Sequence, residues 1–120
     1  MKKIKNIFKK KIKKLKKAYD NKEKVIIFWD YDVDWVTSTS ILIHFMKKIW
    51  IQVSYRLPHR EKDWYGLKNY FIDDVKSVGV TLLITVDCGT RDVEVVKYAK
   101  ANGVDVIITD HHAVPDIVPE

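Results

Sequence analysis

The sequence predicts an α/β fold, in which a parallel β-sheet is flanked by helices and preceded by a basic amphipathic helix. From residue 25 onward, short runs rich in Val and Ile alternate with longer mixed segments, as strands and helices alternate in βαβ units. The joints Ser77-Val78-Gly79-Val80 and Ala101-Asn102-Gly103-Val104 repeat one helix-to-strand pattern. The 120 residues, 47% of them hydrophobic, suffice for one domain or part of one.

Residues 2–19 predict a helix with one apolar stripe and lysines around the rest. Its apolar members recur at helical spacing: Ile4, Ile7, Phe8, Ile12, Leu15 and Tyr19. Residues 1–24 contain 12 lysines and have a net charge of +10, whereas the other 96 residues sum to −4. We expect the stripe to dock on the body of the protein. Attraction of the lysines to a phosphate backbone or to an anionic membrane surface is the alternative.

Four strands and three helices are expected in the remainder. The predicted strands are 25–28, 51–57, 81–86 and 104–109, and the predicted helices are 37–49, 67–78 and 91–102. Continuous apolar strands of this kind belong to a parallel sheet that is covered on both faces. Gly79 and Gly103 stand where a helix ends in a left-handed conformation. Trp50 occupies the corresponding place in the first joint, which is a poor position for an indole.

Polar residues follow every predicted strand. They are Asp30, Asp32 and Asp34 after the first, Arg60 after the second, Asp87 after the third, and Asp110, His111 and His112 after the fourth. A single aspartate in such a place is often only a helix N-cap. The carboxyl ends of parallel strands open on one edge, however, so the four groups should meet. Carboxylates with one imidazole favour Mn²⁺ or Mg²⁺ over Zn²⁺. Two such ions would activate a water and clamp a phosphate.

Composition excludes several classes of protein. The single cysteine, Cys88, excludes an intrachain disulfide and indicates a reduced, cytosolic setting. Cys88 is expected to be a small buried residue rather than a nucleophile. No apolar run approaches the roughly 18 residues of a membrane span. The lysine-dense N-terminus also lacks the apolar core of a secretory signal. We therefore expect a cytoplasmic protein with no membrane partner.

The strand-end motifs together resemble the DHH phosphoesterase superfamily over about residues 24–120. The resemblance rests on Asp30-Tyr31-Asp32-Val33-Asp34, Val36-Thr37-Ser38, Val86-Asp87-Cys88-Gly89 and Thr109-Asp110-His111-His112. The first motif, with Leu57-Pro58-His59-Arg60 and Tyr65-Gly66-Leu67, is similar to the RecJ branch. That resemblance implies a metal-dependent 5′-to-3′ exonuclease of DNA repair and recombination. It implies single-stranded DNA as substrate, and a helicase and a single-strand-binding protein as further partners.

The resemblance also implies roles for the site residues. The implied ligands of the Mn²⁺ or Mg²⁺ ions, two in number, are Asp32, Asp34, Asp87 and His111. Asp30 and Asp110 would support the catalytic site, and Arg60 and His112 would hold the scissile phosphate. A phosphodiesterase of nano-RNA or cyclic dinucleotides is the alternative within the superfamily. A non-catalytic module that binds nucleic acid through the lysine-rich helix is the alternative outside it.

The sequence departs from the family pattern in three ways. Phe28 stands where many relatives have a metal-binding histidine. The pattern continues to a further ligand aspartate, a DHH-associated domain and an OB-type domain. We therefore expect a truncated product, with the basic helix over 1–24 and the first part of the catalytic domain over 25–120.

The third departure concerns tryptophan. All four tryptophans take places where glycine is expected, and none is expected at an ordinary core position: Trp29, Trp35, Trp50 and Trp64. Some bacterial lineages read UGA as glycine, so translation of UGA as tryptophan would explain all four. Four independent substitutions are the alternative.

Overall fold

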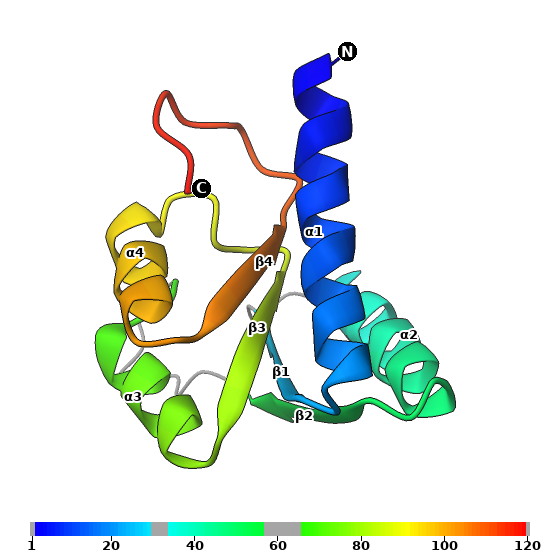
Figure 1. Ribbon diagram of the computed structural model, residues 1–120. Helices are drawn as coiled ribbons and strands as arrows, with labels where there is room; N and C mark the ends of the chain where they lie inside the picture. The colour runs from blue at the N-terminus through cyan, green and yellow to red at the C-terminus, as the bar shows by residue number, and fades with distance from the viewer. Residues whose placement is uncertain (1, 30–33, 57–65, 120) are drawn as a thin grey trace.

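The computed structural model describes residues 2–29, 34–56 and 66–119, with a parallel sheet and helices on both of its faces (Figure 1). The predicted fold class is confirmed, and each predicted helix and strand is present with shifts of a few residues at its ends. In chain order the elements are α1 (Lys2–Asp20), β1 (Lys24–Trp29), α2 (Asp34–Lys48), β2 (Gln52–Arg56), α3 (Asn69–Ser77), β3 (Val80–Val86), α4 (Val93–Ala101) and β4 (Asp105–Thr109).

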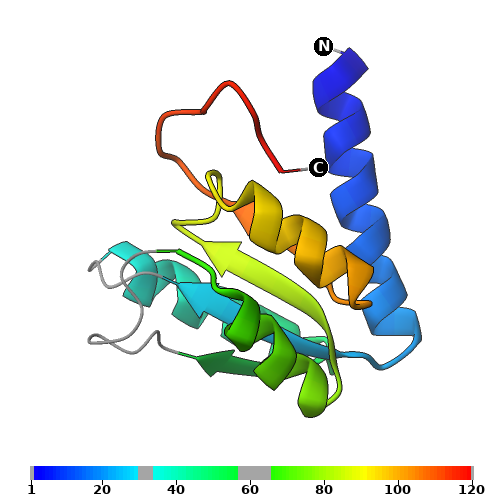
Figure 2. The ribbon, with the colours of Figure 1, turned by 90° about the vertical axis from the view of Figure 1, so that its left-hand side faces the viewer.

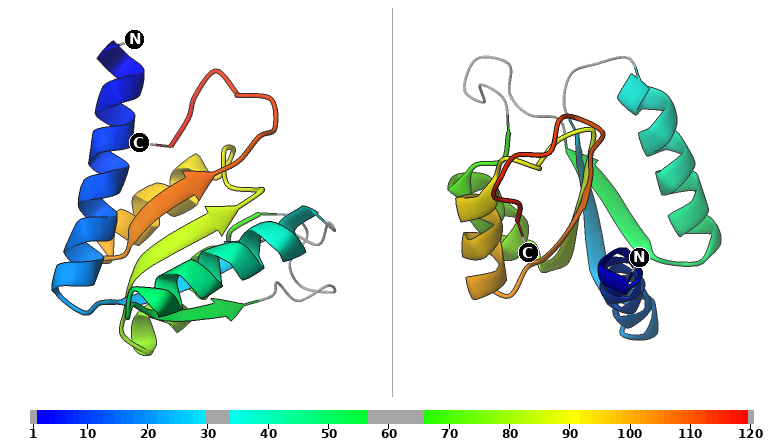
Figure 3. Two further views of the ribbon diagram at one scale, coloured as in Figure 1. Left: turned by 90° about the vertical axis from the view of Figure 1, so that its right-hand side faces the viewer. Right: turned by 90° about the horizontal axis from the view of Figure 1, so that it is seen from above.

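The sheet has the strand order β2-β1-β3-β4, and every neighbouring pair is parallel. All four strands therefore end on the same edge. Helices α3 and α4 cover one face (Figure 2), whereas α1 and α2 lie on the other (Figure 3). At the carboxyl edge, Trp29 of β1 pairs with Val86 of β3, and Val86 pairs with Thr109 of β4. The ends of these three strands consequently lie side by side at this edge.

Each face of the sheet has its own hydrophobic core. Along β1, Val25 and Ile27 pack with residues of α1 and α2, whereas Ile26 and Phe28 pack with α3 and α4. This division explains why the strand is apolar at every position from Val25 to Trp29. Phe28 lies 4.8 Å from Phe71 between ring centroids. The side chain that replaces the family's histidine is thus part of the core.

The left-handed helix ends are confirmed at both predicted glycines. Gly79 has φ +82° and Gly103 has φ +79°. Trp50, in the corresponding place after α2, has φ +62° and is 89% exposed. A side chain with a Cβ is disfavoured in this conformation, and the exposed indole gains little packing in return. The backbone therefore gives position 50 the conformation of a glycine.

Trp29 corrects one expectation, because it does occupy a core position. It is only 4% exposed and stacks on Tyr55 with a centroid distance of 5.2 Å. The reason is its place at the end of the central strand β1, on the side that faces α1 and α2. Trp35 lies in α2 but its side chain is outside the described residues, as is the whole of Trp64.

The docking of α1 corrects another expectation. Phe8 is 63% and Ile12 is 61% exposed, so these members of the predicted apolar stripe do not dock. Leu15 of the stripe does meet the core, together with Ala18, which lies outside the stripe. The N-terminal turns of α1 extend past the end of β4 (Figure 1).

Lysine side chains attach α1 to the open edge of β4. Lys11 Nζ donates to the carbonyl of Ile108 at 2.6 Å, and Lys14 Nζ donates to the carbonyl of Val106 at 3.0 Å. Lys14 also lies 3.7 Å from the carboxylate of Asp105. Burial lowers the pKa of both lysines, and Asp105 opposes that shift at Lys14. These contacts satisfy edge carbonyls that a further strand would otherwise pair. None of the described helices is long and apolar enough to cross a lipid bilayer.

Candidate metal centre

The loops after β3 and β4 bring four predicted site residues together. Asp87 follows β3 directly, and its backbone N–H donates to the carbonyl of Thr109 at 2.8 Å. Asp110, His111 and His112 follow β4. Asp87 has φ +61°, a conformation that aspartate tolerates better than most residues. The backbone turns sharply there, at the edge where the two strands end.

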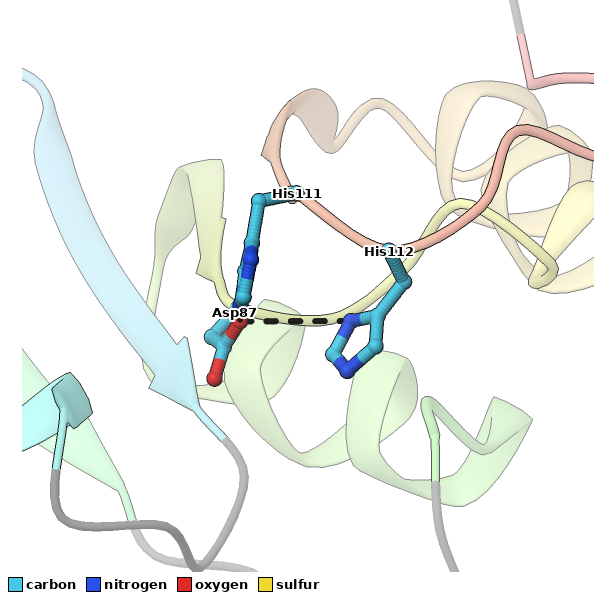
Figure 4. A group of neighbouring side chains, drawn as sticks. All are labelled: Asp87, His111 and His112. Carbon is cyan, nitrogen blue, oxygen red and sulfur yellow. Dashed lines mark ion pairs between the residues drawn. The ribbon is translucent and has the colours of Figure 1, made fainter.

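Asp87 and the two histidines form a compact group of potential metal ligands (Figure 4). The Oδ1 atom of Asp87 lies 2.6 Å from Nε2 of His111 and 3.9 Å from Nδ1 of His112. The Asp87 carboxylate is largely buried, whereas the His111 ring is mostly exposed. One ligand atom from each residue lies within 4.8 Å of the other two. A carboxylate oxygen and two imidazole nitrogens at this spacing fit a divalent ion such as Mn²⁺.

Asp110 holds the His112 ring through its Nδ1 atom. Its Oδ1 atom lies 2.6 Å from His112 Nδ1 and accepts the backbone N–H of His112 at 3.1 Å. Its other oxygen accepts the hydroxyl and the backbone N–H of Thr90. Burial alone would raise the pKa of Asp110, but the hydrogen bonds from Thr90 and His112 outweigh it and hold the pKa well below its ordinary value. An ionised carboxylate can only accept, so His112 Nδ1 carries a proton toward it.

Threonine side chains form hydrogen bonds with the backbone next to the site. Thr85 Oγ1 donates to the carbonyl of Cys88 at 2.7 Å, and Thr109 Oγ1 donates to the carbonyl of Thr85 at 2.6 Å. Gly89 has φ +106°, and a Cβ there would lie 2.8 Å from Thr85 Oγ1. Cys88 is buried and packs in the core beneath α3 and α4. The prediction of a small buried residue at Cys88 is confirmed.

The start of α4 is linked to the segment that precedes α3. Asp92 Oδ2 accepts the backbone N–H of Leu67 at 2.9 Å. Gly66 has φ +91°, and a Cβ there would lie 2.7 Å from Asp92 Oδ1. Burial raises the pKa of Asp92, and the hydrogen bond from Leu67 opposes that shift. Asp92 stands at the N-cap of α4 but makes no side-chain cap bond there. Its carboxylate instead ties down the chain just after residues 57–65.

The remaining predicted site residues lie where the structure gives no side-chain geometry. Asp30, Asp32 and Arg60 fall outside the described residues. Asp34 is the first residue of α2, but its side chain is not described. The ligand and phosphate-binding roles of these residues therefore stay predictions.

Thr90 and Asp92 were not predicted as site residues. The sequence contains a signal for Thr90, because it closes the run Asp87-Cys88-Gly89-Thr90 at a strand end. For Asp92 the sequence signal is that of an ordinary N-cap. Its actual partner, Leu67, is 25 residues away in the chain and could be found only from the fold.

The sheet edge and its aspartate–histidine group define a class of protein. Residues 24–120 match the family model described as the DHH family, N-terminal domain, and the chain belongs to this family. Curated relatives are single-stranded-DNA-specific exonucleases RecJ. The protein from Bacillus subtilis is 44% identical over 99 residues, which are 82% of this chain and 13% of the relative. The protein from Escherichia coli is 33% identical over 103 residues, which are 85% of this chain and 18% of the relative.

Solved structures of RecJ resemble the chain as well. A crystal structure of exonuclease RecJ bound to manganese matches with a TM-score of 0.78 and 30% identity, over 88% of this chain and 27% of that one. RecJ from Thermus thermophilus in complex with Mn²⁺ matches with a TM-score of 0.71 and 27% identity, over 88% and 14%. The chain thus spans well under a third of the length of these proteins.

Proposed function

We propose that this chain is part of a divalent-metal-dependent exonuclease that hydrolyses single-stranded DNA from its 5′ end. The observation that carries the proposal is the contact of 2.6 Å between Asp87 Oδ1 and His111 Nε2 at the carboxyl edge of the sheet. The names of the RecJ relatives supply the substrate class and the reaction. The 5′-to-3′ direction of hydrolysis comes from the family resemblance.

In this proposal Asp32, Asp34, Asp87 and His111 hold the metal, which is Mn²⁺ or Mg²⁺. A bound ion of this kind lowers the pKa of a water and neutralises a phosphate. Asp110 accepts a hydrogen bond from Nδ1 of His112, so Nε2 is the nitrogen through which that ring would contact a phosphate oxygen. Arg60 is proposed to bind the same phosphate, and Asp30 to support the ligands. A helicase and a single-strand-binding protein are proposed as partners of the reaction.

The test is hydrolysis of end-labelled single-stranded DNA with Mn²⁺, measured on the chain and on any longer protein that contains it. We expect Asp87→Asn to abolish hydrolysis, because the amide cannot replace a charged ligand. Asp20→Asn removes an exposed carboxylate at the far end of α1 and should leave the rate unchanged. Release of nucleotides from the 3′ end would contradict the polarity. Faster cleavage of dinucleotides would instead indicate the phosphodiesterase alternative.

A further inference from the structure

Helix α1 carries two distinct faces. Its docked face consists of Lys11, Lys14, Leu15 and Ala18, which contact β4 or the core. The second, which we call the exposed face of α1, consists of Lys5, Phe8, Lys9, Ile12, Lys16 and Tyr19. Their spacing of three and four residues places these six side chains on one side of the helix, and all are exposed. Lysines and bulky apolar side chains thus alternate along a surface that the protein does not cover.

The contacts of the docked face fix the direction of the helix. Lys11 meets Ile108, Lys14 meets Val106, and Lys17 lies 3.6 Å from Asp105, so α1 runs antiparallel to β4. The residues before Lys11 therefore continue in the direction in which β4 runs toward His111. With 1.5 Å per residue, Lys5 lies about 9 Å beyond Lys11 along the axis. Figure 1 shows these first turns rising past the end of β4. The N-terminal part of the exposed face thus flanks the edge that carries the metal centre.

The lysines of the exposed face have no acidic partner among the described residues. Lys5, Lys9 and Lys16 form no ion pair there, whereas Lys14 and Lys17 both pair with Asp105. A polyanion would therefore find unbalanced positive charge beside a metal centre lined with carboxylates. The aromatic ring of Phe8 lies between Lys5 and Lys9, and that of Tyr19 follows Lys16, so both add flat apolar surfaces next to the charges. Lysines with interleaved aromatic rings are typical of surfaces that bind single strands.

The position of the exposed face favours one of two anionic surfaces. Helices that lie in a bilayer surface keep their lysines on one face and bury a separate apolar face. Around the axis of α1, Lys5, Lys9 and Lys16 lie to one side of Phe8, Ile12 and Tyr19, so the helix alone would suit either surface. Its N-terminal turns lie beside the carboxyl edge that carries the metal centre, and this position favours a nucleic acid.

We propose that the exposed face of α1 binds single-stranded DNA, with its lysines on the phosphates and its aromatic rings on the bases, beside the metal centre. The inference rests on the proposed function for the identity of the polymer. It assigns the basic helix a role in holding the substrate, in addition to covering the edge of β4.

The test compares two double charge reversals. Lys5→Glu with Lys9→Glu changes the exposed face of α1, and Lys47→Glu with Lys48→Glu makes the same change of charge at the end of α2, at the opposite edge of the sheet. Binding of a fluorescent thymidine oligonucleotide is measured by anisotropy in EDTA over a range of salt concentrations. Loss of two phosphate contacts should lower the salt slope by about 1.4 and the affinity at low salt by at least about tenfold. The control pair should change affinity by less than about twofold.

A third variant tests the stacking contact. Phe8→Ala should weaken binding of the single strand by about fivefold and leave binding of a matched duplex unchanged. Equal losses from the two charge-reversed pairs, or no loss from either, would overturn the proposal. It would also be overturned if the Lys5/Lys9 pair impaired binding to phosphatidylglycerol vesicles but not to the oligonucleotide.

Failure of this inference and failure of the proposed function are separable. The binding assay contains no metal, so its outcome does not depend on hydrolysis. If the parent protein hydrolyses DNA with Mn²⁺ but the two charge-reversed variants bind the oligonucleotide equally well, the proposed role of α1 is wrong and the proposed nuclease function stands. If only the Lys5/Lys9 variant loses binding and the parent protein hydrolyses no DNA, the role of α1 stands and the nuclease function is wrong.

Discussion

Thr90 and Asp110 show how individual residues orient the candidate site. The Thr90 hydroxyl and backbone N–H both reach one oxygen of Asp110, and the other oxygen is occupied by His112. Partners of this second layer commonly change metal affinity or activity by 10- to 100-fold when they are removed. The position of the His112 ring therefore depends on Thr90 through the carboxylate of Asp110.

Thr90→Val should raise the pKa of Asp110 toward its ordinary value, because one donor to the carboxylate is lost. Thr90→Ser keeps that donor and should keep the low pKa. We expect hydrolysis with Mn²⁺ to fall about tenfold in the valine variant and to be retained in the serine variant. Carbon-13 NMR of the Asp110 carboxylate and the hydrolysis assay check the two expectations. An unchanged pKa in Thr90→Val would show that the hydroxyl contributes nothing.

At the residue scale, Asp87 and His111 could be predicted from the sequence, but the role of Thr90 could not. Asp87 and His111 follow apolar runs at strand ends, so a general rule for parallel sheets located them. Thr90 acts through a contact 20 residues along the chain, which no local pattern reveals. Trp29 is the opposite case. Comparison with a glycine pattern placed it outside the core, but the central strand buries its indole against Tyr55.

Trp50→Gly should stabilise the protein by about 1 kcal/mol, because it relieves a left-handed conformation without removing buried surface. Urea unfolding measures the change. Lys48→Gly, in the last turn of α2, is the matched control and should destabilise by about 1 kcal/mol.

The gene offers a second test of position 50. UGA codons at the four tryptophans would support glycine as the intended residue, and UGG codons would refute it. Destabilisation by Trp50→Gly would show that the indole is the better residue at this position.

At the scale of elements, Asp92 joins α4 to the chain that enters α3. Burial raises the pKa of the Asp92 carboxyl group, so the folded protein holds this proton more tightly than the unfolded chain does. Stability should therefore fall as the pH rises from the ordinary pKa of an aspartate through the raised one, and stay lower above it. The hydrogen bond to Leu67 offsets part of that loss.

Asp92→Asn is neutral at every pH and can still accept the Leu67 N–H. Its stability relative to the parent protein should increase as the pH rises through this window. Asp92→Ala leaves that N–H without its acceptor and should be about 1–3 kcal/mol less stable than Asp92→Asn at all pH values. Urea unfolding at acidic and neutral pH distinguishes these expectations. A constant difference between Asp92→Asn and the parent would contradict the raised pKa.

The elements themselves followed closely from the sequence, with the exception of how α1 docks. Strands β1 and β3 are mostly apolar because both faces are covered, and this pattern predicted them. The apolar stripe of α1 predicted the helix but not its orientation. Lys11 and Lys14 decide the orientation by bonding to the edge carbonyls of β4. Periodicity cannot reveal such contacts, because they join a side chain to the backbone of a strand almost 100 residues away.

At the scale of the whole molecule, charge and topology converge on one edge. The parallel sheet brings the loops after β3 and β4 together, and α1 extends past the end of β4 on the same side. The acidic body and the basic helix thus have separate roles in the proposed function. In that proposal the carboxylates would hold the metal, and the lysines would attract the polymer.

Manganese binding is the measurement that tests the metal centre most directly. Titration of Mn²⁺ into the chain, followed by the electron paramagnetic resonance signal of free Mn²⁺, reports binding whether or not hydrolysis occurs. We expect saturable binding that Asp87→Asn weakens at least about tenfold and Asp20→Asn leaves unchanged. Asparagine is tolerated in left-handed backbone, so it should preserve the turn at position 87. Binding of equal strength in the parent protein and Asp87→Asn would contradict the assignment of a metal centre to this edge.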